Sequence, residues 1–94
     1  VARAASAIVP KEPIDGPVEV RLIFVMPRPK SRKRDVWHTA KPDADNLAKA
    51  VLDVLTKVGL WVDDSRVAGL TVLKVYSTID SLSGCRVLVE ELAS

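Results

Sequence analysis

Two pairs of aspartates flank one predicted helix and have the chemistry of a metal site. Asp43 and Asp45 lie in the segment PDADN, and Asp63 and Asp64 lie in the segment LWVDDSRV. The N-terminus of a helix favours one nearby negative charge through its unpaired N–H groups and its dipole, but it does not need four. If the two pairs meet, a hard divalent cation is the usual means of offsetting their repulsion. Oxygen ligands without His or Cys suit Mg²⁺ or Mn²⁺ rather than zinc.

Whether the first pair can share a ligand depends on where the helix begins. Within a helix, residues two positions apart point to nearly opposite sides. At the cap the two carboxylates can converge if Asp43 is still extended while Asp45 opens the helix, so we expect one of them to be the N-cap. The second pair would reach the first if a strand beginning near Leu60 runs back beside the helix.

Lys49 follows Asp45 by four residues and therefore shares its helical face. Its ammonium could contact a phosphate or the transition state of a phosphoryl reaction. The same spacing also fits a plain ladder of i,i+4 ion pairs on a solvent-exposed face, formed by Asp45, Lys49, Asp53 and Lys57. Both interpretations are open at the level of the sequence.

The helix that would position these residues is the clearest element of the sequence. Its apolar residues recur on one stripe, and Gly59 is a typical stop signal after the last of them. The stripe consists of Leu47, Ala50, Val51, Val54, Leu55 and Val58.

Strands are predicted on both sides of this helix. Residues 18–26 alternate and are rich in β-branched side chains, which is typical of a strand. Residues 67–77 and 85–92 have the same character, and we expect them to form an antiparallel hairpin. Residues 1–8 resemble the tail of a helix that Pro10 ends. The predicted fold class is α+β, with the order α-β-α-β-β and a small mixed β-sheet packed against helices.

Composition limits the kind of protein. The 94 residues predict one domain, 1–94, with a core so small that a partner subunit would help to stabilise it. No apolar run approaches the roughly 20 residues of a membrane-spanning helix, so we expect no membrane association. Cys85 is the only cysteine, which excludes an internal disulfide and favours a reducing, intracellular compartment such as the cytoplasm. Because the chain begins with Val1, we expect an N-terminal part to be missing.

Basic residues are concentrated between the first strand and the helix, where Asp35 is the only acid. This segment could be a solvated surface loop, or it could bind phosphates by releasing counterions from nucleic acid. Trp37 is a candidate for stacking on DNA, although it could also dock on a partner subunit. His38 could touch a phosphate or simply be solvated, and we expect Trp61 to pack under the acidic site rather than to stack on a base. The basic residues are Arg28, Lys30, Arg32, Lys33, Arg34 and Lys41.

The segment KPDADNLAKAVLDVL, followed by GLWVDDSRV, resembles the RusA family of Holliday junction resolvases. The match is continuous from Lys41 to Val67. The resemblance implies a homodimeric, Mg²⁺-dependent endonuclease that resolves four-way DNA junctions by paired nicks in recombination and repair. It implies three metal-binding acids and one required basic residue, with two further motif residues in supporting roles. The three metal-binding acids would be Asp43, Asp45 and Asp64, and the required basic residue would be Lys49. Asp63 and Asn46 would have the supporting roles.

We therefore expect a homodimeric metal-dependent endonuclease that acts on branched DNA, with Mg²⁺, or Mn²⁺ in its place, as cofactor. Residues of the basic segment would hold the DNA arms. Two other functions are compatible with the same sequence features. One is a non-catalytic DNA-binding module, although such a module would not need acids that repel phosphate. The other is a structural or interaction protein whose acids only cap the helix, which a metal titration would distinguish from the enzyme.

Overall fold

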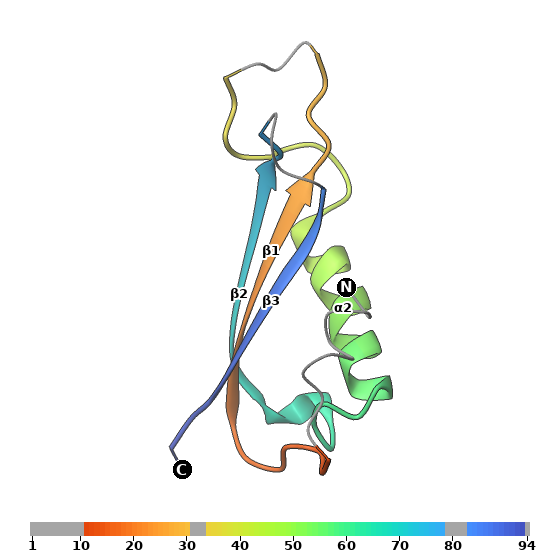
Figure 1. Ribbon diagram of the computed structural model, residues 1–94, viewed down its shortest axis with the longest axis vertical. Helices are drawn as coiled ribbons and strands as arrows, with labels where there is room; N and C mark the ends of the chain where they lie inside the picture. Colours follow the sequence, from red (N-terminus) through yellow and green to blue (C-terminus); the bar gives the residue numbers. More distant parts are fainter. Residues whose placement is uncertain (1–10, 31–33, 79–82, 94) are drawn as a thin grey trace.

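The computed structural model describes residues 11–30, 34–78 and 83–93, which form a sheet and one long helix (Figure 1). The predicted strands and the central helix are confirmed, whereas the helix predicted at residues 1–8 lies outside the described residues. Within the described ranges, no helix is long and apolar enough to cross a membrane. The elements are β1 (Val18–Met26), α2 (Ala44–Lys57), the 3-10 turn η1 (Asp64–Arg66), β2 (Val67–Tyr76) and β3 (Gly84–Glu91).

The described strands form a mixed sheet in the order β2-β1-β3. β1 pairs with β2 in parallel and with β3 in antiparallel register. The predicted hairpin between the last two strands is therefore wrong, because β1 lies between them. β1 carries the most deeply buried residues of the sheet, with Val18, Val20 and Leu22 each 0% exposed, and a central strand is the position in which such residues are covered best.

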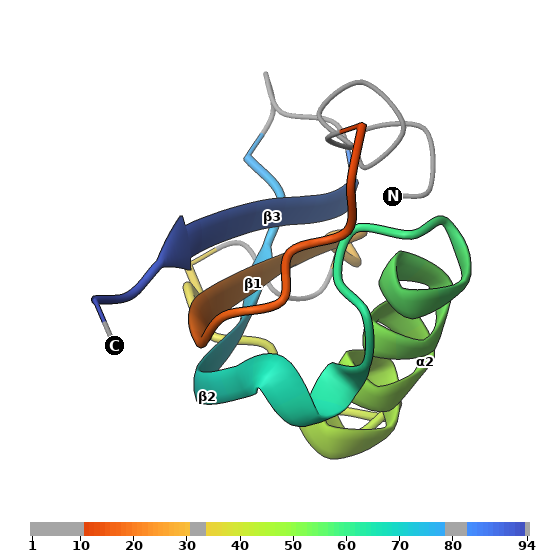
Figure 2. The same ribbon diagram turned by 90° about the horizontal axis from the view of Figure 1, so that it is seen from below.

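Helix α2 covers one face of this sheet, as Figure 2 shows. Its buried residues Ala48, Val51 and Leu55 belong to the same core cluster as the inward-facing residues of β1. Trp61 is 1% exposed and its indole Nε1 donates a hydrogen bond to Thr56 Oγ1 at 2.8 Å. The expectation that Trp61 packs in the interior is confirmed.

Both ends of α2 lie where the start and stop signals in the sequence predict them. Asp43 is the N-cap with extended backbone (φ −72°, ψ 149°), and the Leu47 N–H donates to the Asp43 carbonyl oxygen at 3.1 Å. After the C-cap residue Val58, Gly59 adopts φ +83°, a left-handed conformation that glycine tolerates better than any other residue.

Candidate functional site

A pocket of ≈ 430 Å³ lies where α2 faces β2. Apolar side chains of both elements line it, including Leu52 of α2 and Leu70 and Val72 of β2. Four exposed charged residues stand among them and come from two separate segments of the chain, namely Asp45, Lys49, Asp53 and Asp64.

The helix contributes three of these charges because of their spacing. Asp45, Lys49 and Asp53 are separated by four residues each, so they form one stripe along α2. The prediction that Asp45 and Lys49 share a face is confirmed, and that face is turned toward β2. Sequence reasoning treated Asp53 only as part of a surface ladder, although the same spacing could have placed it in the pocket.

Asp64 reaches this pocket because the chain turns back after the helix. The condition named for this approach, a strand beginning near Leu60, is not met. β2 begins at Val67, as predicted from the sequence, and η1 carries Asp64 just before it. Trp61 instead forms an isolated bridge with Ile14, ahead of β1. Asp64 lines the same pocket as Asp45. That the two acidic pairs meet at one ion stays a prediction.

The ladder of ion pairs along α2 is not formed. Within residues 11–30, 34–78 and 83–93, ion pairs join Arg21 to Glu19 and Arg66 to Asp15, and none joins Lys49 to an acid of the helix. These charges lie on an exposed face, as the ladder interpretation requires, but the described residues show no ion pairs between them. Lys49 presents an ammonium that is not paired with another described residue, which leaves it available to an external anion.

Asp43 lies at the start of α2, but it is not among the described residues that line the pocket. Its carboxylate makes no capping hydrogen bond to the helix. Helix capping therefore does not account for an acid at this position. Its convergence with Asp45 on one ligand stays a prediction.

The donor chemistry of the site suits a hard divalent cation, although the described part of the chain holds no complete cage for one. Among those residues, no group of three or more His, Cys, Asp or Glu side chains is placed to hold a metal ion. Mg²⁺ does not require such a cage, because proteins usually hold it with one or two carboxylates, several waters and the phosphates of a substrate. Asp45 and Asp64 line one pocket and have oxygen donors of the kind that such a site uses. That they share one ion stays a prediction.

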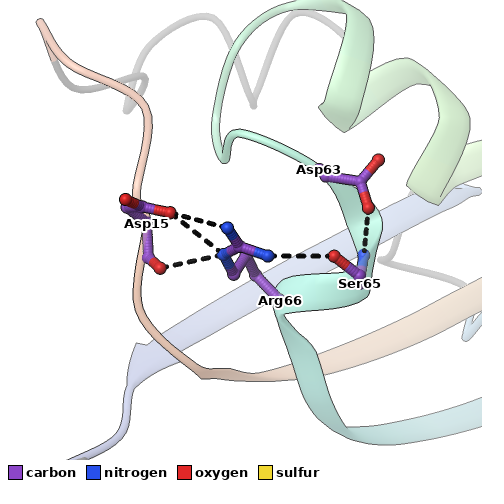
Figure 3. A network of polar contacts seen from close by, with 4 residues as sticks. All are labelled: Asp15, Asp63, Ser65 and Arg66. Atoms are coloured by element: carbon purple, nitrogen blue, oxygen red, sulfur yellow. Dashed lines mark hydrogen bonds and ion pairs between the residues drawn. The ribbon is translucent and has the colours of Figure 1, made fainter.

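Asp63 has a different task from its neighbour Asp64, because it contacts Ser65 within the turn (Figure 3). Its Oδ2 accepts the Ser65 N–H at 3.0 Å and caps η1. Hydrogen bonding by the Ser65 side chain and backbone lowers the pKa of Asp63, and the nearby charge of Arg66 acts in the same direction. Asp63 therefore fixes the turn that presents Asp64.

Arg66 anchors the same turn to the segment before β1 (Figure 3). Its Nε donates to the Asp15 carbonyl oxygen at 2.9 Å, its Nη2 donates to Asp15 Oδ1 at 2.8 Å, and its Nη1 donates to Ser65 Oγ at 3.1 Å. The ion pair between Arg66 and Asp15 was not predicted from the sequence. The Asp-x-Ser spacing of Asp63 and Ser65 could have indicated the cap, but no local signal connects Arg66 with Asp15.

The comparisons with known proteins decide the family. A family model described as "Endodeoxyribonuclease RusA" matches residues 1–83. The chain belongs to the RusA family. It is 40% identical over 62 residues to the crossover junction endodeoxyribonuclease RusA of Escherichia coli K12, covering 66% of this chain and 43% of that protein. The same figures hold for the enzyme of Enterobacteria phage 82.

A third relative of this RusA-family chain is the uncharacterized protein YqaN of Bacillus subtilis strain 168. It is 38% identical over 88 residues, which cover 82% of this chain and 61% of that protein. The chain thus spans less than two thirds of the length of these curated relatives. The resemblance found in the central motif is confirmed.

The basic segment of this RusA-family chain contains residues of two kinds. Arg28 is engaged: its Nε donates to the Ser77 carbonyl oxygen at 2.8 Å, its Nη2 donates to the Asp35 carbonyl oxygen at 2.7 Å, and its guanidinium lies 5.3 Å from the centroid of the Tyr76 ring. Lys30, Arg34 and Lys41 are exposed, while Arg32 and Lys33 lie outside the described residues.

The two aromatic candidates of this segment also differ. His38 is 9% exposed and packs edge-on against Tyr76, with ring centroids 5.0 Å apart. Neither interpretation of His38, as a phosphate contact or as a solvated loop residue, is therefore correct. Trp37 is 57% exposed, and its backbone forms an isolated bridge with Val75. That placement leaves the Trp37 ring accessible to a stacking partner.

Proposed function

We propose that this chain is the catalytic part of a divalent-metal-dependent endodeoxyribonuclease that resolves four-way DNA junctions by paired nicks. The observation that carries the proposal is the shared pocket of Asp45, Lys49 and Asp64. These residues match the RusA motif, and two relatives carry the name crossover junction endodeoxyribonuclease.

Asp45 and Asp64 would hold Mg²⁺, or Mn²⁺ in its place, with Asp43 as a third acid at the start of the helix. The ion supplies Lewis-acid chemistry, because it lowers the pKa of water and offsets charge on a phosphodiester. Lys49 adds a positive charge on the same stripe, where its ammonium can bind a non-bridging phosphate oxygen. Asp63 holds the turn, and Asn46 extends from the exposed first turn of α2 as a supporting residue.

The apolar part of the pocket increases the effect of these charges. Leu52, Leu70 and Val72 line the pocket together with the carboxylates and would exclude part of the water around a bound phosphate. Coulomb interactions gain strength as the local dielectric falls. A phosphate that enters the pocket would therefore interact with Lys49 more strongly than it would on an open surface.

The DNA arms would lie along the basic segment that leads into α2. Lys30, Arg34 and Lys41 are exposed there and can neutralise phosphates, and Trp37 can stack on a base. We include Arg32 and Lys33 in the same role. Besides binding DNA, Arg28 would have a structural role, because it joins the basic segment to the end of β2.

A homodimer would bring two such sites to one junction. Among the described elements, no helix covers the face of the sheet opposite α2 (Figures 1 and 2). Leu73 of β2 is 38% exposed and Leu88 of β3 is 54% exposed, and both are aligned with outward-facing residues of β1. An isologous contact through this face would relate two pockets by a two-fold axis, which suits the symmetry of paired nicks.

A cleavage assay on a synthetic four-way junction tests the proposal. The full chain should produce paired nicks with Mg²⁺ or Mn²⁺ and none in the presence of EDTA, and linear duplex should stay intact. Glu12→Gln is a matched control, because Glu12 is an exposed acid ahead of β1, outside both the pocket and the sheet. Junction binding without cleavage under every metal condition would instead identify a non-catalytic DNA-binding module.

A further inference from the structure

One lysine outside the acidic motifs holds the segment that leads to Asp43. Lys74 lies on β2, and its Nζ donates to the carbonyl oxygens of Ala40 at 2.8 Å and Pro42 at 2.7 Å. Pro42 directly precedes Asp43, the N-cap of α2. The ammonium of Lys74 is thus joined to the backbone immediately before the first acid of the RusA motif.

The backbone of β2 fixes the same segment. The His38 N–H donates to the Lys74 carbonyl oxygen at 2.9 Å, and the Tyr76 N–H donates to the Val36 carbonyl oxygen at 2.9 Å. Residues 36–38 therefore run along the free edge of β2, and the Lys74 side chain continues this attachment to residue 42. The path from the basic segment into α2 is fixed along its final stretch.

The position of Lys74 in the sheet is unusual for a charged residue. In register it is aligned with Phe24 of β1, which is 5% exposed and faces the core. Its neighbours on the same face of β2 are Val72 and Tyr76. The side chain is half-buried, and its ammonium reaches the exposed loop at the edge of the sheet, where it is hydrogen-bonded. An ammonium has three donors, so one lysine can satisfy both loop carbonyls.

We propose that Lys74 is a positioning residue, which fixes the backbone before Asp43 so that Asp43 and Asp45 are presented to the metal ion. This inference rests on the proposed function. Lys74 itself is not among the described residues that line the pocket and acts through the loop. Groups that orient metal ligands typically change metal affinity by about 10-fold to 100-fold when they are removed.

A different role for Lys74 makes opposite predictions. If its ammonium bound a DNA phosphate, its loss would weaken metal-free junction binding and lower the slope of log affinity against log salt by about 0.9. In that case the loss of Lys74 would leave metal affinity unchanged. A role in stability alone would lower the midpoint of unfolding and leave both affinities unchanged in the folded protein.

The experiment compares Lys74→Met, Lys74→Arg and the parent in the full chain. Lys74→Met keeps the aliphatic stem and removes the donors, and Lys57→Met is the control, because Lys57 is an exposed lysine in the last turn of α2. Mn²⁺ affinity is measured by electron paramagnetic resonance without DNA. Amide exchange of Leu47, whose N–H donates to the Asp43 carbonyl oxygen, reports on the start of the helix.

We expect Lys74→Met to weaken Mn²⁺ binding by about tenfold, to speed amide exchange at Leu47 and to leave metal-free junction binding unchanged. Lys74→Arg, which keeps a cationic donor, should restore most of the affinity, and Lys57→Met should match the parent. If Lys74→Met does not fold, Lys74→Gln, with one amide group for two carbonyls, should give an intermediate loss.

Unchanged Mn²⁺ affinity in a folded Lys74→Met or Lys74→Gln variant would overturn the inference, as would a loss confined to DNA binding. Both results leave the proposed function intact as long as the parent binds metal and cleaves junctions. If the parent neither binds Mn²⁺ nor cleaves, the proposed function fails first and the role of Lys74 fails with it.

Discussion

Adjacent acids in this chain have different surroundings, and the difference assigns them different tasks. Asp63 accepts the Ser65 N–H and caps η1, whereas Asp64 lines the pocket beside α2. The sequence DDSR shows two equal carboxylates. Their hydrogen bonds distinguish a structural acid from one that is available to a ligand.

Asp63→Asn should therefore be mild. Asn caps a helix about as well as Asp, so η1 should persist and junction cleavage should stay within a few-fold of the parent. Circular dichroism and the cleavage assay measure this directly. Cleavage as low as in an Asp64→Asn variant would show that Asp63 also holds the metal ion.

The lowered pKa of Asp63 gives a pH dependence with a definite sign. Because the folded pKa lies below the ordinary value of 3.8, the ionised carboxylate stabilises the folded state above that value. This contribution is lost as the pH falls through the folded pKa. The stability advantage of the parent over Asp63→Asn in urea unfolding should thus shrink as the pH is lowered below 3.8. An advantage independent of pH would contradict this account of the cap.

At the scale of elements, local patterns predicted what forms but not how it is arranged. The apolar stripe and Gly59 predicted α2, and alternation predicted the three described strands. Which strands become neighbours depends on burial across the whole sheet. β1 therefore lies between β2 and β3, where the sequence had predicted a hairpin of the last two strands. The partners of Lys74 and Arg66 lie far away in the sequence, and no local signal could reveal them.

The turn that ends α2 gives a test at this scale. Gly59→Ala should lower the free energy of unfolding by about 1 kcal/mol, because a Cβ is unfavourable at φ +83°. Gly16→Ala is the matched control, since an added Cβ there meets nothing within 4 Å and the backbone is not left-handed. Urea unfolding of both variants measures the difference. Equal stabilities would contradict the role of Gly59 as the stop of the helix.

At the scale of the whole molecule, the proposed function needs both the acids on one face of α2 and the basic segment at its start. Because phosphates repel carboxylates, the proposed function requires that cations hold the DNA and that a metal ion assist its approach to the pocket. The sequence predicted this separation of charge. It did not show that Arg28 is engaged in the loop while Lys30, Arg34 and Lys41 are exposed.

Replacing Lys30, Arg34 and Lys41 together by alanine should weaken junction binding at every salt concentration. Each lost phosphate contact should lower the slope of log affinity against log salt by about 0.9. Binding titrations at several salt concentrations measure the slope. A slope equal to that of the parent would show that these side chains do not contact the DNA backbone.

Two exposed leucines on the face of the sheet opposite α2, Leu73 and Leu88, lead us to expect a dimer in solution. Leu88→Glu, which places a charge on that face, should shift the protein toward monomer in light scattering at micromolar concentration, and Leu88→Ala should shift it less. A parent that is monomeric and still makes paired nicks would contradict the dimer.

The central claim, that acids from two distant segments form one metal-dependent site, is tested most directly by comparing junction cleavage and metal-free junction binding in Asp45→Asn and Asp64→Asn. Each change keeps the size of the side chain and removes a charged oxygen ligand. We predict that both variants fold, that both bind the junction as tightly as the parent or more tightly, and that the nicked products disappear in both. Glu12→Gln, outside the pocket, should cleave like the parent. Cleavage at the parental rate by either aspartate variant would contradict the claim.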